Sequence, residues 1–373
     1  NEQKDIKLTD DERNELRELS PLKDHLHRFQ YRYDYMLRLL VWNPKGETAR
    51  HYAKYRQLLI GDLVRRHHVD LIMLQEISSK VPSDYVKQFP SSRLATYSIE
   101  YSGRSNMEVA IIYNKQRLRI TTVYDSHELV NDLHKADVFV NKSLFATRGP
   151  SRLQIVRFQV LNDHWQEFIA INLHSIYNGC KDEGKQHFLL DFFLLANYMQ
   201  TTYKLPVLIG GDFNYDIACN VGAYFETLDD ICFERYNFSL SIAVTQRLDE
   251  DYDIKTPLSN QIDYIVLLQN KDTPYKIQCN HSQRIPIRHE DYFNNDRQSP
   301  VHKFGLDNKL EPLKVSTHDP IFTYLMITDH QHIQHSHSNN NNSNNKNDLT
   351  SQLNQLSLHD ENSTIITLEG SAS

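Results

Sequence analysis

Short apolar runs alternate with turn-forming residues through the middle of the chain, and they predict a protein of mixed strands and helices. The runs predict strands at residues 36–41, 69–74, 109–113, 153–160, 168–173, 206–209, 262–268 and 321–326. Apolar positions at helical spacing predict two helices, at residues 48–67 and 185–203. Many short strands with few helices between them favour two stacked sheets that are flanked by helices.

Composition divides the chain into three zones. Residues 1–35 are highly charged and carry leucines at helical spacing, which predicts an N-terminal helix or arm. Residues 36–328 contain the apolar runs and predict one compact domain. Residues 329–373 are rich in His, Asn and Ser, and their small apolar content does not offset the entropy lost on ordering. We therefore expect this tail to be disordered.

The charge balance argues against a protein that coats nucleic acid through bulk electrostatics. The whole chain has 41 Lys and Arg against 48 Asp and Glu. The tail holds five of the acids and one of the bases, which leaves residues 1–328 with 40 bases, 43 acids and a net charge of −3. Such a near-neutral body still allows an enzyme that grips one or a few phosphates locally.

Two further features narrow the class of protein. The sequence contains no run of 18 apolar residues, so we expect no transmembrane helix. The four cysteines show no CxxC spacing, so neither a zinc site nor a redox pair is indicated. We expect a soluble monomer in the cytoplasm or nucleus, and secretion stays open because an upstream signal peptide could have been removed.

Polar side chains that can bind a metal ion or transfer a proton stand at the ends of the predicted strands. If these ends converge, they form a rim of oxygen and imidazole groups, which suits Mg²⁺, Mn²⁺ or Ca²⁺ rather than zinc. A hard cation beside an imidazole suits a phosphate ester, because the cation neutralises oxygens and the histidine manages a proton. The residues concerned are Asn43, Glu76, His174, Asp212, Asn214, Asp263 and His318.

These motifs resemble the endonuclease/exonuclease/phosphatase superfamily, which includes deoxyribonuclease I, apurinic endonucleases, inositol polyphosphate 5-phosphatases and neutral sphingomyelinases. The most specific motif is Gly-Gly-Asp-Phe-Asn at 210–214, found with Trp42-Asn43, Gln75-Glu76 and Ile-Asp-Tyr at 262–264 in the family's order. The resemblance implies a four-layered α/β sandwich of the deoxyribonuclease I type, with two central mixed β-sheets flanked by helices. It also makes residues 36–328 the catalytic domain.

The resemblance implies a role for each matching residue. Glu76 matches the family's principal metal-binding carboxylate, and Asn43 matches the amide beside it. Asp212 matches the acid that orients or deprotonates the attacking water. Asn214 matches the amide that holds the phosphate and the loop of that acid.

Two histidines match positions that the family pairs with carboxylates. His318 resembles the family's terminal histidine, and Asp263 the carboxylate that fixes its tautomer. His174, in Leu-His-Ser, is similar to the deoxyribonuclease-type histidine that serves as general acid or phosphate ligand. Glu108 is the candidate partner of His174, but a one-residue slip along its strand would turn Glu108 to the other face.

Two positions leave alternatives open. Arg148, in Arg-Gly-Pro, resembles the family's Arg-x-Pro turn, where a guanidinium forks onto a phosphate; a plain surface arginine is the alternative. Thr317 stands where the family commonly has the Asp of a terminal Ser-Asp-His. This departure either weakens the case for a second metal ion or lowers the activity.

The implied activity is a divalent-metal-dependent phosphodiesterase that works by in-line attack of an activated water, with Mg²⁺ expected and Mn²⁺ or Ca²⁺ as alternatives. Leu-His-Ser, Arg-Gly-Pro and Ile-Asp-Tyr favour a nuclease with DNA or RNA as substrate. Substrate choice lies in the loops, so a phosphoinositide phosphatase, a sphingomyelinase-type phosphoesterase and a degenerate phosphate-binding module stay open. Residues 270–315 are long for a loop and are the best place to look for specificity, with a family-specific insertion that binds no ligand as the alternative.

Overall fold

The computed structural model describes most of the expected catalytic domain. The ranges are residues 36–44, 53–77, 83–87, 89, 94–101, 108–140, 142–162, 165–176, 182–215, 217, 227–243, 263–285 and 318–329. The arm expected at 1–35 and nearly all of the expected tail lie outside these ranges, so the domain boundaries stay a prediction.

One mixed sheet has six strands in the order β11-β12-β1-β2-β4-β3. Strands β1 and β2 are parallel, and every other pair is antiparallel. We call it sheet A; its strands are β1 (Met36–Trp42), β2 (Leu71–Gln75), β3 (Tyr97–Glu100), β4 (Val109–Asn114), β11 (Tyr275–Arg284) and β12 (Ile321–Asp329).

The second sheet, sheet B, repeats this plan in the order β5-β6-β7-β8-β10-β9. Its single parallel pair is β7 with β8, and the other pairs are antiparallel. The strands are β5 (Leu118–Tyr124), β6 (Leu153–Val160), β7 (Glu167–His174), β8 (Val207–Asp212), β9 (Ser241–Ala243) and β10 (Asp263–Leu268). In each sheet a helix connects the two parallel strands, because a parallel pair needs a long crossover.

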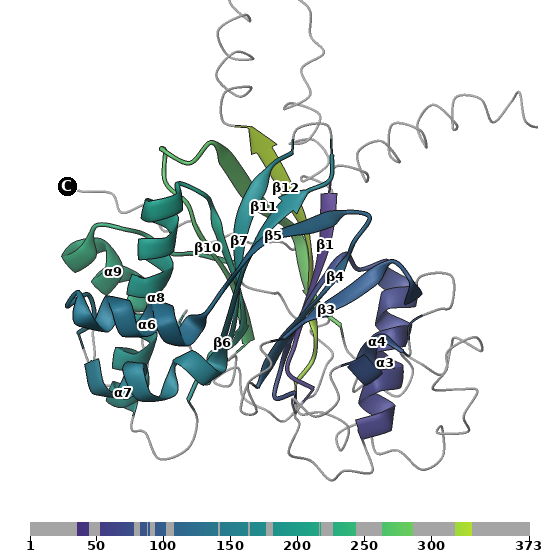
Figure 1. Ribbon diagram of the computed structural model, residues 1–373, viewed down its shortest axis with the longest axis horizontal. Helices are drawn as coiled ribbons and strands as arrows, with labels where there is room; N and C mark the ends of the chain where they lie inside the picture. Colours follow the sequence, from purple (N-terminus) through teal and green to yellow (C-terminus); the bar gives the residue numbers. More distant parts are fainter. Residues whose placement is uncertain are drawn as a thin grey trace, which may run out of the picture.

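Helices cover the outer face of each sheet and complete four layers (Figure 1). On sheet A lie α3 (Ala53–His67) and α4 (Ser83–Val86). On sheet B lie α6 (Ser126–Lys135), α7 (Lys142–Arg148), α8 (Asp182–Tyr203) and α9 (Leu228–Tyr236). Of the helices that the structure describes, none combines the length and apolar content that a membrane-crossing segment needs.

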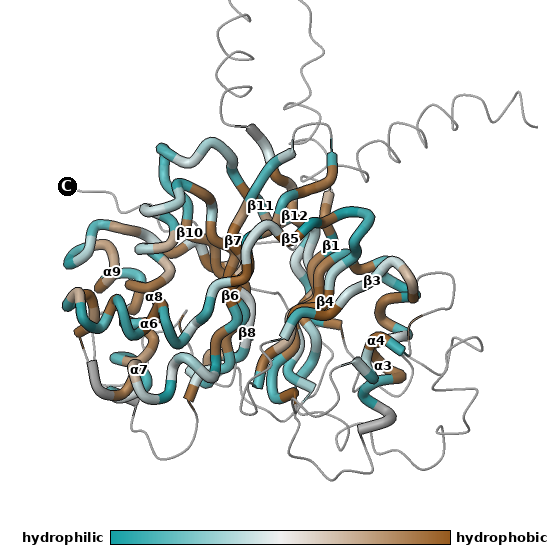
Figure 2. Tube along the Cα trace, in the orientation of Figure 1, coloured by the Kyte–Doolittle hydropathy of each residue, from teal (hydrophilic) through white to brown (hydrophobic). Residues whose placement is uncertain are grey.

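Apolar side chains fill all three interfaces between the layers. The central one packs side chains such as Val41 and Met73 of sheet A against Ala170, Leu208 and Ile265 of sheet B. Figure 2 shows hydrophobic residues concentrated along the central strands. A strand that is buried on both faces reads as a continuous apolar run, which is why these strands are visible in the sequence.

The predicted four-layered sandwich is confirmed, and every predicted strand and helix is present with closely similar bounds. The first five residues of the helix predicted at 48–67 lie outside the described residues. The apolar pattern of the sequence did not predict the strands β3, β5, β9 and β11 or the helices α4, α6, α7 and α9. The missed strands lie at sheet edges, where one face or one side is open and the residues are more polar. The prediction of a long loop at 270–315 is wrong for its first part, because the edge strand β11 lies within these residues.

Two glycines of β8 allow neighbouring chains to approach closely. A Cβ on Gly210 would lie 2.6 Å from the Sδ of Met73 and 2.8 Å from a methyl carbon of Val41, both on sheet A. A Cβ on Gly211 would overlap the backbone carbonyl oxygen of Leu173 on β7. The first glycine therefore sets the spacing between the sheets, and the second sets the spacing between two strands.

We expect both Gly→Ala substitutions on β8 to destabilise the protein, and Gly211→Ala to do so more. Gly210→Ala overpacks the central layer at a cost of about 1–3 kcal/mol, part of which the flexible Met73 side chain relieves by moving. Gly211→Ala meets backbone, which cannot move without disturbing the β7–β8 pair. Urea denaturation measures both free energies of unfolding; an equal or larger loss for Gly210→Ala would contradict this account.

Candidate active site

Three chemically active side chains of sheet B stand side by side on adjacent strands. Asp212 is in register with His174 on β7 and with Asp263 on β10. Paired positions on neighbouring strands point to the same face of a sheet. Because Leu208, four residues before Asp212 on β8, packs between the sheets, all three side chains project from sheet B toward sheet A.

Sheet A contributes an amide and a carboxylate from the ends of its parallel pair. Asn43 directly follows β1, and Glu76 directly follows β2. The Nδ2 of Asn43 donates hydrogen bonds to Oε1 of Glu76 at 3.0 Å and to Oδ2 of Asp212 at 2.7 Å. Asn43 is fully buried, so this one amide joins a carboxylate of each sheet.

The backbone at the end of β2 has an uncommon conformation. Glu76 has a φ of 50°, in the left-handed region that residues other than glycine rarely adopt. Just before it, the Nε2 of Gln75 donates to Oδ1 of Asn172 on β7 at 2.7 Å. Asn172 in turn donates to the carbonyl oxygens of Leu74 and Ala110 at 2.9 Å each. This buried amide network holds the strained end of β2 against sheet B.

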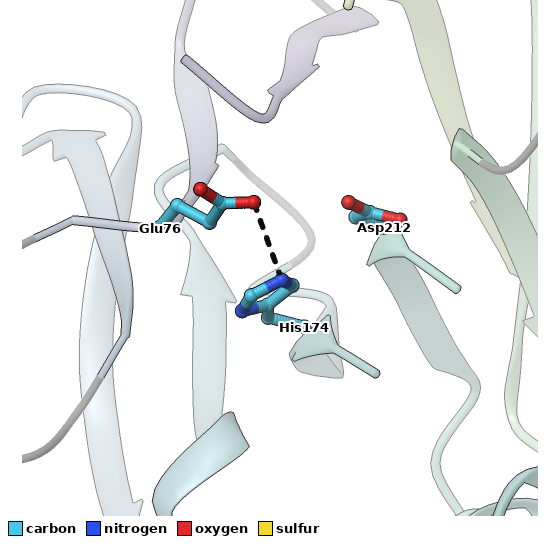
Figure 3. Close-up of side chains that lie close together, drawn as sticks. All are labelled: Glu76, His174 and Asp212. Atoms are coloured by element: carbon cyan, nitrogen blue, oxygen red, sulfur yellow. Dashed lines mark ion pairs between the residues drawn. The ribbon is translucent and has the colours of Figure 1, made fainter. Parts of the chain in front are cut away.

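His174 lies between two carboxylates of sheet A. Its Nδ1 is 2.6 Å from Oε2 of Glu108, and its Nε2 is 3.6 Å from Oε1 of Glu76. Figure 3 shows the side chains of Glu76, His174 and Asp212 converging on one point. The hydrogen bond from His174, with the charge of Arg152 behind it, lowers the pKa of Glu108 although burial opposes the lowering. The pairing expected for Glu108 is therefore present.

Arg152 is a site neighbour that the sequence analysis did not identify. It ends the short 3₁₀ turn η2 (Pro150–Arg152), and its Nη1 lies 3.2 Å from Oε2 of Glu108 and 3.3 Å from Nδ1 of His174. Arg148, which the resemblance favoured, is exposed at the last position of α7. Both arginines flank the same Gly-Pro turn. The sequence motif therefore indicated the correct segment, but in the folded protein it is Arg152 that contacts His174 and Glu108.

His318 and Asp263 form the expected pair, with Nδ1 of the histidine 2.7 Å from Oδ2 of the acid. Burial disfavours the charged imidazole, but the charge and hydrogen bond of Asp263, with Asp212 and Glu76 further away, raise the pKa of His318 to about 9. The carbonyl oxygen of His318 accepts a hydrogen bond of 3.0 Å from Nε1 of Trp42. That bond connects the His318 segment to the end of β1.

Asp212 is the central acid of the site and is almost completely buried. Burial, with the nearby charge of Asp263, raises its pKa to about 6, and the two histidines and the Asn43 hydrogen bond oppose this rise. The backbone N–H of Asn214 donates to Oδ1 of Asp212 at 2.9 Å, and the Nδ2 of Asn214 donates to the carbonyl oxygen of Ser175 at 3.1 Å. Asn214 therefore holds the loop that follows Asp212.

Two overlapping groups of side chains have the spacing of metal ligands. Glu76, His174 and Asp212 form one, and Asp212, Asp263 and His318 form the other, with the ligand atoms of each group within 4.8 Å of one another. Buried carboxylates that repel one another are stabilised by a cation, and carboxylate and amide oxygens are the ligands that Mg²⁺ and Ca²⁺ prefer. The residues present at this position thus fit a hard divalent cation.

The structure brings nearly all of the predicted site residues together at one end of the central layer. Arg148 is exposed and makes no side-chain contact with this cluster within the part of the chain that the structure describes. Thr317 lies outside the described residues. The cluster contains Asn43, Glu76, Glu108, His174, Asp212, Asn214, Asp263 and His318.

We expect Asp263→Asn to lower the pKa of His318 from about 9, because the opposing effect of burial remains when the partner charge is lost. In the unmodified protein the folded-state pKa lies above the ordinary 6.5, so this ion pair stabilises the fold fully below pH 6.5 and loses its effect as the pH rises through about 9. A ¹H–¹⁵N NMR titration of metal-free protein measures the change. Asp272→Asn, on an exposed turn, is the control. If the pKa of His318 is unchanged in Asp263→Asn, the pairing is contradicted.

Comparison with known proteins finds likeness in structure only. No family model matches the chain, and no curated protein matches it. An endonuclease/exonuclease/phosphatase family protein from Bacteroides thetaiotaomicron matches with a TM-score of 0.51 and 17% identity, over 79% of this chain and 98% of the other. A Bacteroides vulgatus endonuclease/exonuclease/phosphatase matches with a TM-score of 0.50 and 13% identity, over 79% and 99%.

The catalytic domain of human Nocturnin, solved with a bound sulfate anion, has a TM-score of 0.50 and 12% identity, over 79% of this chain and 95% of that one. At such identities the matches speak for the fold alone. This fold agrees with the sequence motifs at Asn43, Glu76, Asp212 and His318, which resemble the same superfamily. The chain therefore has the fold of the endonuclease/exonuclease/phosphatase superfamily.

Proposed function

We propose that this protein is a divalent-metal-dependent phosphoester hydrolase, and that its substrate is a phosphodiester bond of a nucleic acid. The observation that carries the proposal is the convergence of Glu76, Asp212, His174 and His318 from two sheets on one small volume. Carboxylates, imidazoles and a buried amide in this arrangement supply each function that metal-assisted hydrolysis needs.

Glu76 and Asn43 are the residues that would hold the cation, with Asp212 within reach of it. The cation is Mg²⁺ in our proposal, and Mn²⁺ or Ca²⁺ suit the same oxygen ligands. When bound, it supplies positive charge that offsets the negative charge on the phosphate oxygens in the transition state.

Asp212 would accept the proton of the attacking water. A carboxylate with a pKa of about 6 is a stronger base than an ordinary aspartate and is still mostly ionised at neutral pH. The hydrogen bonds from Asn43 and from the backbone of Asn214 hold its two oxygens in place. This fixed orientation lowers the entropy cost of reaching the transition state.

The two histidines would act on the phosphate oxygens. With a pKa of about 9, His318 is an imidazolium at neutral pH and places a positive charge beside the phosphate. His174 is held at Nδ1 by Glu108, which leaves its Nε2 facing Glu76 and able to donate a proton to the leaving oxygen. The pairing of His174 with Glu108 is of the deoxyribonuclease type, which supports a nucleic acid as substrate.

Removing the metal is expected to stop hydrolysis, and replacing the base is expected to slow it strongly. We expect EDTA to stop turnover, Glu76→Gln to weaken the response to Mg²⁺, and Asp212→Asn to lower kcat roughly 100- to 10,000-fold, because a general base contributes that much. Initial rates at graded Mg²⁺ concentrations measure these effects. Asp132→Asn, an exposed acid on α6, is the matched control and should keep full activity; retained activity in Asp212→Asn would refute the assignment.

A substrate panel tests the nuclease part of the proposal separately. It contains plasmid DNA, abasic duplex, RNA, phosphoinositides and sphingomyelin, each with Mg²⁺, Mn²⁺ and Ca²⁺. We expect nicking of plasmid DNA or cleavage of RNA. Release of inorganic phosphate from phosphoinositides without nicking would make the protein a phosphatase, and binding without hydrolysis of any substrate would make it a degenerate module.

A further inference from the structure

Arg152 lies on the opposite edge of the His174 ring from the proposed metal-binding carboxylate. Glu76 approaches Nε2 of the imidazole at 3.6 Å, whereas the Nη1 of Arg152 lies 3.3 Å from Nδ1. A phosphate bound beside Glu76 and Nε2 is therefore separated from the guanidinium by the width of the ring. The position of Arg152 suits a second anionic group of the same substrate better than the group that is cleaved.

The guanidinium is held in place by the protein through one nitrogen. Its Nη1 donates to the carbonyl oxygen of Ser175 at 3.0 Å and to that of His174 at 3.4 Å, and it lies 3.2 Å from Oε2 of Glu108. The short turn η2 that begins at Pro150 sets the direction of the side chain, which is 23% exposed. Such a half-buried arginine is oriented before any ligand arrives.

The rest of the guanidinium has donors to spare. An arginine carries five N–H donors in a planar fork, and the contacts above use Nη1. Within the described part of the chain, neither Nε nor Nη2 of Arg152 has a hydrogen-bond partner, and neither is completely enclosed. These two nitrogens form the edge that binds phosphate in forked pairs.

Glu108 limits how strongly this edge can bind an anion. Its carboxylate is 43% exposed and lies 3.2 Å from the guanidinium, so it offsets part of the positive charge. A phosphate would have to share Arg152 with Glu108, each on its own edge. We therefore expect a moderate contribution, of about tenfold in affinity, for one charged hydrogen-bonding group.

We infer that Arg152 anchors the phosphate next to the scissile one on a nucleic acid strand, and so makes the site prefer a polynucleotide over an isolated phosphodiester. The inference rests on the proposed function. A polynucleotide supplies a phosphate at every link, whereas bis(4-nitrophenyl) phosphate has only the one that is cleaved. The two substrates therefore separate binding at Arg152 from the chemical step.

The test compares Arg152→Gln with Arg119→Gln. Arg119, on the exposed side of β5 over the Trp165 ring, is the matched control. Arg152→Gln is expected to raise KM for a single-stranded oligonucleotide about tenfold, with a much smaller loss on bis(4-nitrophenyl) phosphate. Arg119→Gln is expected to stay within about twofold on both substrates. Equal losses on the two substrates for Arg152→Gln would overturn the inference, because Arg152 would then act by orienting His174.

Binding of a fluorescent oligonucleotide in EDTA tests the same residue without turnover. Arg152→Gln is expected to weaken the affinity about tenfold, and Arg152→Lys to weaken it too, because an ammonium group does not offer two edges. An unchanged affinity in both variants, or a loss in Arg148→Gln instead, would overturn the inference. If the unmodified protein binds the oligonucleotide through Arg152 but cleaves nothing, the proposed hydrolase fails and the anchoring role stands.

Discussion

The hydrogen bonds of the Asn43 amide to Glu76 and Asp212 are the contacts on which the candidate site depends. They join the ends of three strands: β1 and β2 of sheet A, and β8 of sheet B, which lies far from them in the sequence. The buried carboxylate of Asp212 and the half-buried carboxylate of Glu76 would repel each other without a donor between them. Because one amide group donates a hydrogen bond to each carboxylate, the positions of the charges in the site and the distance between the two sheets depend on each other.

The distance between the sheets is set by residues of the central layer next to the site. Gly210 leaves no side chain between the sheets, so Val41 and Met73 pack directly over β8. The amides of Gln75 and Asn172 then connect the sheets next to Glu76 and His174. Protein interiors are packed tightly enough to transmit small displacements, so a change at these buried positions is felt at the carboxylates.

The pKa values of Asp212 and His318 are both raised, by burial above all for Asp212 and by the neighbouring acids for His318, and Asp263 contributes to both shifts. Burial and Asp263 make it harder for Asp212 to ionise, and the acids together make it easier for His318 to hold a proton. A base close to neutral pH and a charged imidazole thus arise from one set of side chains. This is the division of acid and base roles that hydrolysis of a phosphoester requires, and it connects the fold to the proposed reaction.

The sequence by itself determined the class of the fold and most of the site, because strands buried on both faces read as apolar runs and the polar residues at their ends are conspicuous. It did not reveal edge strands such as β5 and β11, whose polar residues face solvent and follow no strict pattern. It also left open whether Glu108 faces His174, since a strand's register depends on its partners and not on its own residues. Only the tertiary structure decided that Arg152 rather than Arg148 reaches the site, because a short turn between α7 and β6 directs the side chain. Only the tertiary structure decided that the pKa values of Asp212 and His318 are raised, because such shifts depend on burial and on charges brought together from distant strands.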